Sequence, residues 1–265
     1  MDKRLVRTHF GRSSKTYDEY AVVQKKMGLR LAAMVANAGA FKRILEIGCG
    51  TGFLTKRLAE LYPEAEIIAS DISPQMLEQA RENLGEYANI EYMVVDGEAL
   101  TLAGPFDLIV SNAAFQWFKD YPAALEGLKE KLAPGGYLFY ATFGEKTFWE
   151  LHQAFAIARE KLGIGVDCDD RHGPTFITRE TLERIVDALS MPALFQEELF
   201  VETFGSVKEF LLSVKRVGAN NASGQQRGTN RRLLLKMMDA YQKLFAPKSK
   251  IEATYHVIYA CQQNL

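Results

Sequence analysis

Residues 44–52 read Ile-Leu-Glu-Ile-Gly-Cys-Gly-Thr-Gly and combine a carboxylate with three glycines at alternate positions. The apolar residues before the glycines predict a strand, and residues 53–61 predict a helix that begins directly after them. Glycine allows a tight turn and lets a ligand approach the backbone closely. The helix presents unpaired N–H groups and a positive dipole end toward that turn. The sequence therefore predicts a nucleotide-type pocket at the end of the first strand of a parallel sheet.

The spacing of these glycines argues against a dinucleotide as the ligand. A dinucleotide-binding turn has the pattern G-x-G-x-x-G, and here Phe53 occupies the position of the third glycine. Glu46 would repel a pyrophosphate but attract a cationic amino group. S-Adenosylmethionine carries an ammonium group and a sulfonium, and it has no phosphate. The run resembles the glycine-rich signature of the class I S-adenosylmethionine-dependent methyltransferases; a glycine-rich turn of an unrelated fold is the alternative.

Acidic residues follow the next two predicted strands. Asp71 ends the strand at residues 66–70, and an acid there can accept hydrogen bonds from both ribose hydroxyls. Any one acid alone could be a helix cap or turn residue, but several acids at successive strand ends favour one shared site. The family resemblance implies that Asp96, after the strand at residues 90–95, meets the adenine amino group. The residues assigned to the cofactor are Gln24, Glu46, Gly48, Cys49, Gly50, Gly52, Asp71, Ile72, Met76, Asp96, Gly97, Glu98 and Asn112.

Strands and helices alternate through the first half of the chain, which predicts a parallel sheet with helices on both faces. We predict a helix at about residues 13–36 before the glycine-rich strand. The predicted fold is α/β, a Rossmann-like seven-stranded class I methyltransferase sheet whose last strand is antiparallel. Four later strands are predicted at residues 106–112, 137–143, 194–204 and 251–260.

One domain, residues 1–265, is expected, and its second half contains long segments between the last strands. Two Ser/Thr-x-x-Glu patterns, beginning at Thr147 and Ser206, predict helix starts within those segments. Long helical insertions at the mouth of a pocket are usually lids or substrate-recognition elements. The expected parts are an N-terminal helical cap (1–40), a cofactor-binding core (41–143), and lid or substrate insertions (144–192 and 205–250).

The composition is that of an ordinary globular protein. Of 265 residues, 48% are hydrophobic and 25% are charged, and the net charge of −1 gives no overall field that favours nucleic acid or an anionic membrane. No stretch approaches about 18 uninterrupted apolar residues. The three cysteines form no C-x-x-C pair, which argues for a reducing compartment and against structural zinc. We expect a cytoplasmic protein with no metal and with neither nucleic acid nor membrane as a partner.

Three segments outside the glycine-rich core indicate which kind of compound accepts the methyl group. Residues 10–24 place Phe10, Tyr17 and Gln24 on one face of the predicted helix, although core packing is the plainer interpretation. With residues 111–117 and 215–221, this segment resembles the malonyl-acyl carrier protein O-methyltransferases of biotin synthesis. One departure is Ala113-Ala114-Phe115, where the family pattern has bulkier aliphatic residues.

The resemblance implies methylation of the free carboxylate of a malonyl thioester, carried on acyl carrier protein or on coenzyme A. A carboxylate with a pKa of roughly 4 is ionised at neutral pH, so no general base is expected. An arginine fork suits a carboxylate, and Arg171 with His172 is the second choice for this cation. The residues expected to position the substrate are Tyr17, Gln116, Trp117 and Arg216.

A basic segment suggests where an acidic carrier protein would dock. Residues 215–250 contain nine basic residues and one acid, Asp239, although the whole chain is slightly acidic. Such a segment attracts acidic partners; a solvated helix face is the alternative. The residues predicted to dock the carrier are Lys215, Arg227, Arg231, Arg232 and Lys236.

Two other functions stay open from the sequence. One is a methyltransferase for another small carboxylic acid or a quinol-type acceptor, with the same core and a different lid. The other is a non-catalytic S-adenosylmethionine-binding protein. A nicotinamide dehydrogenase is disfavoured by Phe53 and Glu46.

Overall fold

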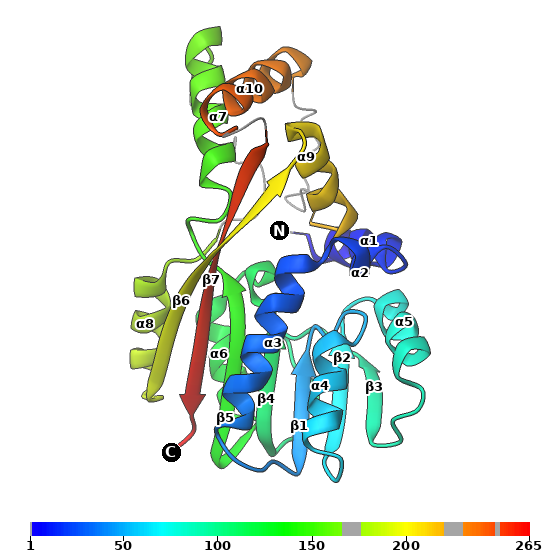
Figure 1. The fold of residues 1–265 in the computed structure, drawn as a ribbon. Helices are drawn as coiled ribbons and strands as arrows, with labels where there is room; N and C mark the ends of the chain where they lie inside the picture. Colours follow the sequence, from blue (N-terminus) through cyan, green and yellow to red (C-terminus); the bar gives the residue numbers. More distant parts are fainter. Residues whose placement is uncertain (1, 166–175, 220–229, 247–249) are drawn as a thin grey trace.

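The computed structural model describes residues 2–165, 176–219, 230–246 and 250–265. One sheet has helices on both faces, and helices α7 (Trp149–Leu162), α9 (Val207–Arg216) and α10 (Arg231–Leu244) stand beyond one end of it (Figure 1). The strands are hydrogen-bonded in the order β3-β2-β1-β4-β5-β7-β6, and β7 is antiparallel to both neighbours. This confirms the predicted seven-stranded α/β sheet. The strands are β1 (Arg43–Ile47), β2 (Glu66–Asp71), β3 (Ile90–Val94), β4 (Phe106–Asn112), β5 (Leu132–Phe143), β6 (Ala193–Phe204) and β7 (Ile251–Gln263).

The central strands are apolar along nearly their whole length because helices cover both faces of the sheet. Successive side chains of β1 point to opposite faces. Ile44 belongs to the apolar cluster that contains residues of α3 (Val22–Ala36) and α4 (Phe53–Leu61), whereas Leu45 belongs to the cluster that contains residues of α6 (Tyr121–Lys129) and α8 (Arg179–Ala188). α5 (Pro74–Leu84) packs beside β2 and β3. α8 therefore lies against the sheet, although the sequence places it in an insertion over the pocket.

The N-terminal segment differs from the single helix predicted at about residues 13–36. It forms α1 (Lys3–Ser13), α2 (Tyr17–Tyr20) and α3. Asp2 caps α1, because its side chain accepts a hydrogen bond from Arg4 N at 2.9 Å. The backbone leaves the helical region at Ala21, with φ −82° and ψ 43°. The prediction that Phe10, Tyr17 and Gln24 share one helix face was wrong, because these residues belong to three separate helices.

The helices beyond the sheet have their own apolar cluster. Phe210 of α9 and Met237 and Tyr241 of α10 pack there against Ile251 and other residues at the start of β7. Ser206 caps α9 as predicted, accepting a hydrogen bond from Glu209 N at 3.2 Å. No helix in the described parts of the chain is long and apolar enough to cross a membrane.

The second predicted capping box, Thr147 with Glu150, does not cap α7. Phe148 precedes the helix with φ 58°, and no side chain caps it. Thr147 Oγ1 instead donates to the carbonyl oxygen of His256 at 3.1 Å, and Glu150 accepts from Thr254 N at 3.2 Å. These polar residues therefore attach the turn between β5 and α7 to strand β7.

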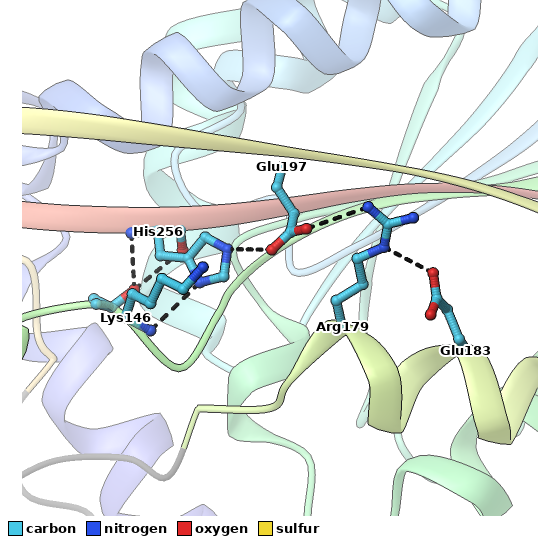
Figure 2. Close-up of polar contacts among 6 residues, drawn as sticks. Lys146, Arg179, Glu183, Glu197 and His256 are labelled. Carbon is cyan, nitrogen blue, oxygen red and sulfur yellow. Dashed lines mark hydrogen bonds and ion pairs between the residues drawn. The ribbon is translucent and has the colours of Figure 1, made fainter.

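His256 anchors the same turn through its imidazole ring (Figure 2). His256 is 1% exposed, and its Nδ1 accepts a hydrogen bond from Lys146 N at 3.4 Å. Nε2 therefore carries the proton and donates to Glu197 Oε1 at 2.8 Å, and Arg179 of α8 donates to the other oxygen of Glu197 at 3.2 Å. Gly144 must be a glycine, because a Cβ there would lie 2.4 Å from His256 Nδ1. The network fixes the turn that leads into α7.

Candidate functional site

The glycine-rich run forms a turn between β1 and α4, as predicted. Gly48 has φ 70° and Gly50 has φ 56°, values in the left-handed region that favours glycine. A Cβ on Gly48 would lie 2.5 Å from the Cβ of Ala114, so this position is closed to larger residues. A Cβ on Gly50 would meet only the Tyr17 ring, at 4.0 Å. Gly50 therefore leaves open space beside the backbone.

That open space belongs to two neighbouring cavities at the carboxyl ends of β1, β2 and β4. The first cavity encloses about 680 Å³, counting its open side, and the small pocket beside it encloses about 360 Å³. Gly48, Gly50 and Asn112 line both. Of the predicted cofactor residues, Gly52 and Glu98 line neither. The others that line the first cavity are Asp71, Ile72, Met76, Asp96 and Gly97, and those that line the small pocket are Gln24, Glu46 and Cys49.

Asp71 lies at the corner between β2 and α5 and joins that corner to the glycine turn. Its Oδ2 accepts from Gly50 N at 3.0 Å, and its Oδ1 accepts from Ser73 N at 2.8 Å. Ser73 caps α5, as the sequence predicts. The Asp71 side chain is 8% exposed, and burial raises its pKa to about 6 despite these backbone donors.

Glu46 is a buried carboxyl group in the wall of the small pocket. It is 1% exposed, and its Oε2 accepts a hydrogen bond from Thr55 Oγ1 at 2.6 Å. Burial raises the pKa of Glu46 to about 8, and the nearby charge of Asp71 acts in the same direction. Glu46 is therefore mostly protonated at neutral pH, and a cation in the small pocket would favour its ionised form.

Asn112, at the end of β4, provides a second polar group toward the small pocket. Its Nδ2 donates to the carbonyl oxygen of Gln24 at 2.9 Å. Its Oδ1 is buried and accepts no hydrogen bond from any residue that the structure describes. A buried acceptor without a donor is costly, so this oxygen suits a ligand that brings N–H groups.

Asp96 and Glu98 have different roles. Asp96 lines the first cavity, and both of its oxygens accept from Lys3 Nζ at 2.6 Å. Glu98 Oε1 accepts from Lys119 N at 2.7 Å and from Asp120 N at 2.6 Å, so Glu98 holds the segment that precedes α6. The sequence analysis missed Lys3 because it placed the first helix too late. The sequence did contain a signal for this earlier helix: Asp2 is a typical helix cap, and the apolar residues Val6 and Phe10 follow it four residues apart.

A second, larger cavity lies between the end of the sheet and helices α2, α7, α9 and α10. It encloses about 1390 Å³, counting its open side, and aromatic rings form a large part of its wall. Those rings include Phe143 and Phe148 at the β5–α7 turn, together with Phe155 and Tyr255. Phe10, Tyr17, Ala113 and Trp117 line both the first and the second cavity. The two cavities therefore meet at these four residues.

Three predicted substrate-positioning residues lie at or near this meeting point. Trp117 is 9% exposed, and its buried Nε1 has no hydrogen-bond partner among the described residues. Gln116 lines the second cavity, but its amide nitrogen donates to Ala113 O at 2.6 Å and its oxygen accepts from Thr142 at 3.4 Å. Burial raises the pKa of Tyr17, so its hydroxyl is neutral. Trp117 therefore offers a buried N–H donor, and the Tyr17 hydroxyl keeps its proton beside it.

Arg216, the fourth predicted residue, lies outside the wall of the second cavity. It is exposed, and its guanidinium lies 5.9 Å from the centroid of the Tyr20 ring. Lys215 is the basic residue of α9 that lines the cavity, together with Leu211 and Val214. These three residues are spaced by three and four positions and share one helix face, a signal that the sequence contained.

The predicted docking residues are only partly within the described chain. Arg231, Arg232 and Lys236 are exposed on α10, and Leu234 and Met237 of the same helix line the second cavity. Arg171, His172 and Arg227 lie outside the described residues. Where the structure is described, no three His, Cys, Asp or Glu side chains gather in a way that could hold a metal ion.

The sheet order and the position of the cavities define the class of protein, a class I methyltransferase. Residues 44–136 match the model of the methyltransferase domain family. A solved Bacillus halodurans protein, described as a methyltransferase, matches with a TM-score of 0.61 at 12% identity, covering 88% of this chain and 96% of that one. At this identity the match shows the fold alone.

Sequence relatives identify the family. Malonyl-[acyl-carrier protein] O-methyltransferase of Acetivibrio thermocellus is 39% identical over 267 residues, which cover 98% of this chain and 93% of the relative. The enzyme of that name from Anoxybacillus flavithermus is 39% identical over 261 residues, with 98% and 96% covered. The chain belongs to the malonyl-[acyl-carrier protein] O-methyltransferase family, as the sequence resemblance predicted.

The raised pKa of Glu46 leads to a prediction about cofactor binding. An ammonium group in the small pocket should ionise Glu46, so binding S-adenosylmethionine at pH 7 should release close to one proton. Affinity should rise from pH 6 to about pH 8, and fall above it as the cofactor amine, with a pKa of about 8, loses its proton. Calorimetry in two buffers of different ionisation enthalpy measures the released protons.

Glu46→Gln should abolish the proton release and weaken binding about tenfold or more, since a hydrogen bond to a charged group is lost. The exposed Glu66 is the matched control, and Glu66→Gln should leave both quantities unchanged. Binding by the wild-type protein without proton release would contradict the assignment of Glu46 to the ammonium group.

Proposed function

We propose that the protein transfers the methyl group of S-adenosylmethionine to the free carboxylate of a malonyl thioester on acyl carrier protein, an early step of biotin synthesis. The observation that carries this proposal is that the first and second cavities share Tyr17 and Trp117 in their walls. A cofactor in one cavity and an acceptor in the other would meet there. The relatives described above bear the name of this activity. Cys49 and Cys261 are unpaired, which supports a reducing, cytoplasmic setting.

The cofactor would lie across the carboxyl ends of three strands. Its ammonium group would face Glu46 and the free oxygen of Asn112 in the small pocket. Its ribose would lie against Asp71, and its adenine would lie near Asp96, between Ile72 and Gly97. The sulfonium would then point its methyl group toward Tyr17 and Trp117.

The reaction requires positioning and no proton transfer. A carboxylate oxygen of the acceptor forms the new C–O bond to the methyl carbon as the C–S bond breaks. The bonding electrons stay on sulfur, and S-adenosylhomocysteine leaves. The acceptor is already ionised at neutral pH, since its reference pKa is roughly 4. Holding the two reactants in line can supply about 7–11 kcal/mol.

Trp117 is the residue best placed to orient the acceptor carboxylate. Its indole N–H is buried without a partner among the described residues, in the wall that both cavities share. Lys215 supplies a positive charge in the wall of the second cavity. Arg216 stays a candidate only if it moves from the Tyr20 ring toward the mouth of that cavity.

One observation favours a second candidate function, methylation of a quinol-type hydroxyl. A hydroxyl acceptor needs a base to remove its proton. His152 lines the second cavity, and burial lowers its pKa, so its imidazole is neutral at pH 7 and able to accept a proton. On this reading, replacing His152 would abolish transfer, whereas a carboxylate acceptor does not need it.

The experiment that tests the proposed function supplies methyl-labelled S-adenosylmethionine with malonyl attached to acyl carrier protein or to coenzyme A. We expect label in a base-labile methyl ester, with the carrier-bound substrate preferred. Transfer should persist in His152→Ala. Cofactor binding without transfer to either thioester would reject the proposed function and would support a non-catalytic cofactor-binding protein.

Trp117→Phe should lower kcat/KM for the malonyl substrate about 10- to 100-fold, because a hydrogen bond to a charged group is lost while an aromatic ring stays in the wall. Cofactor affinity should stay within about twofold. Trp149→Phe is the matched control, because the Trp149 N–H donates to Thr254 and not to either cavity. Unchanged steady-state kinetics in Trp117→Phe would remove Trp117 from this role.

We further propose that the outer face of α10 docks the carrier protein. Arg231, Arg232 and Lys236 are exposed there, and the inner face of the same helix forms part of the second cavity. A carrier bound on this face would lie next to the cavity that receives its acyl group. Positive charge on the face would steer an acidic carrier toward it.

The charge-reversed double variant Arg231→Glu/Arg232→Glu should raise KM for carrier-bound substrate about tenfold at low salt and leave KM for malonyl-coenzyme A within about twofold. Lys161→Glu/Lys243→Glu makes the same change in net charge in the last turns of α7 and α10, and we expect little effect. Equal increases for the two double variants would reject a defined docking face.

A further inference from the structure

Lys3 joins two acidic residues at the end of the first cavity. Its Nζ donates to both oxygens of Asp96 at 2.6 Å, and it also forms an ion pair with Glu98 Oε2. The same ammonium lies 5.9 Å from the centroid of the Phe118 ring. Lys3, Asp96 and Phe118 all line the first cavity. A residue at the start of α1 is therefore part of the wall of the proposed cofactor site.

The acids around Lys3 are otherwise held by the backbone. Asp96 Oδ1 accepts from Glu98 N at 3.0 Å, and Glu98 Oε1 accepts from Lys119 N and Asp120 N. The Asp96 and Glu98 side chains are partly to largely buried, at 33% and 10% exposed. Two carboxylates this close repel each other, and the ammonium between them offsets that repulsion. Without it, the Asp96 carboxylate would turn away from Glu98.

We propose that Lys3 is a positioning residue that fixes the Asp96 carboxylate for recognition of the adenine amino group, and so sets the selectivity of the site for adenine. The inference rests on the proposed function, because it requires the cofactor in the first cavity. Asp96 Oδ1 accepts from both Lys3 Nζ and Glu98 N, whereas Oδ2 accepts from Lys3 alone and keeps a lone pair to which the exocyclic amino group of adenine can donate. Hypoxanthine presents a carbonyl oxygen at that position and would be rejected, because acceptor would face acceptor.

The selectivity is measured with two neutral ligands, S-adenosylhomocysteine and S-inosylhomocysteine, which differ only at the purine. Neither carries the sulfonium charge, so a change of charge at residue 3 acts on both equally. We expect the wild-type protein to prefer the adenine compound about tenfold or more, and Lys3→Met to reduce the preference to about threefold or less. Lys3→Arg keeps the charge and a donor fork, so it should restore most of the preference.

Val6→Ala is the matched control for a purely structural effect of α1. Val6 is a buried residue of α1 that packs against Trp117 and also lines the first cavity, so its truncation loosens the helix and widens the cavity but removes no group that bonds Asp96. We expect this variant to weaken both ligands by the same factor and to leave their ratio unchanged. Thermal unfolding of each variant checks that the fold is intact.

The outcomes separate this inference from the proposed function. A wild-type protein that binds neither ligand would reject the cofactor site itself. A wild-type protein that binds S-adenosylhomocysteine, with Lys3→Met retaining the full preference, would overturn only the role of Lys3. An equal loss of preference in Val6→Ala would also overturn the role of Lys3, because any change in the packing of α1 would then be enough to remove the preference for adenine.

Discussion

The arrangement around the first cavity and the small pocket depends on two buried carboxyl groups at the ends of β1 and β2. Glu46 and Asp71 are almost fully buried, and burial raises the pKa of each, to about 8 and about 6. For Glu46 the folded pKa lies above the ordinary value of 4.5, so the stability it contributes is lost as pH rises from about 4.5 through about 8. A bound cation reverses this cost. The glycine turn is open at Gly50 so that a ligand can reach these groups.

The acceptor half depends on a different constraint, the attachment of a turn to β7. The β5–α7 turn carries Thr147 and Phe148, which line the second cavity, and its polar groups bond to Thr254 and His256. Strand β7 pairs with β5 in the sheet and supports the apolar cluster of α7, α9 and α10 at its other end. One long strand thus aligns the larger cavity with the cofactor end of the sheet.

The lining of the first cavity and of the small pocket could largely be predicted from the sequence, because its residues lie at fixed places relative to strand ends. Glu46 lies near the carboxyl end of β1, and Asp71 and Asn112 are the last residues of β2 and β4. Parallel strands bring their carboxyl ends together at one edge of the sheet. The second cavity could not be predicted in this way. Its aromatic wall joins Phe143, Phe155 and Tyr255, which only tertiary packing brings together.

Two differences from the sequence prediction have separate physical causes. A helical spacing across residues 10–24 fitted one helix, but the helix is interrupted twice, at residues 14–16 between α1 and α2 and at Ala21 between α2 and α3. Arg216 was favoured for its chemistry, whereas the face of α9 that turns inward contains Lys215. Chemistry selects the residue type, and the burial of neighbouring apolar residues decides which member of a basic pair reaches the cavity.

The aromatic wall of the second cavity is consistent with the charge changes of the proposed reaction. A cationic sulfonium and an anionic carboxylate become a neutral thioether and a neutral ester, so charge is lost as the transition state forms. Water stabilises the charged reactants more than the transition state, and a dry apolar cavity removes that stabilisation. A dry wall would also strengthen the few polar contacts that remain, above all the hydrogen bond that we propose for Trp117. A carrier arm that fills the mouth of the cavity would exclude water at the moment of transfer, which ties docking on α10 to the rate of the chemical step.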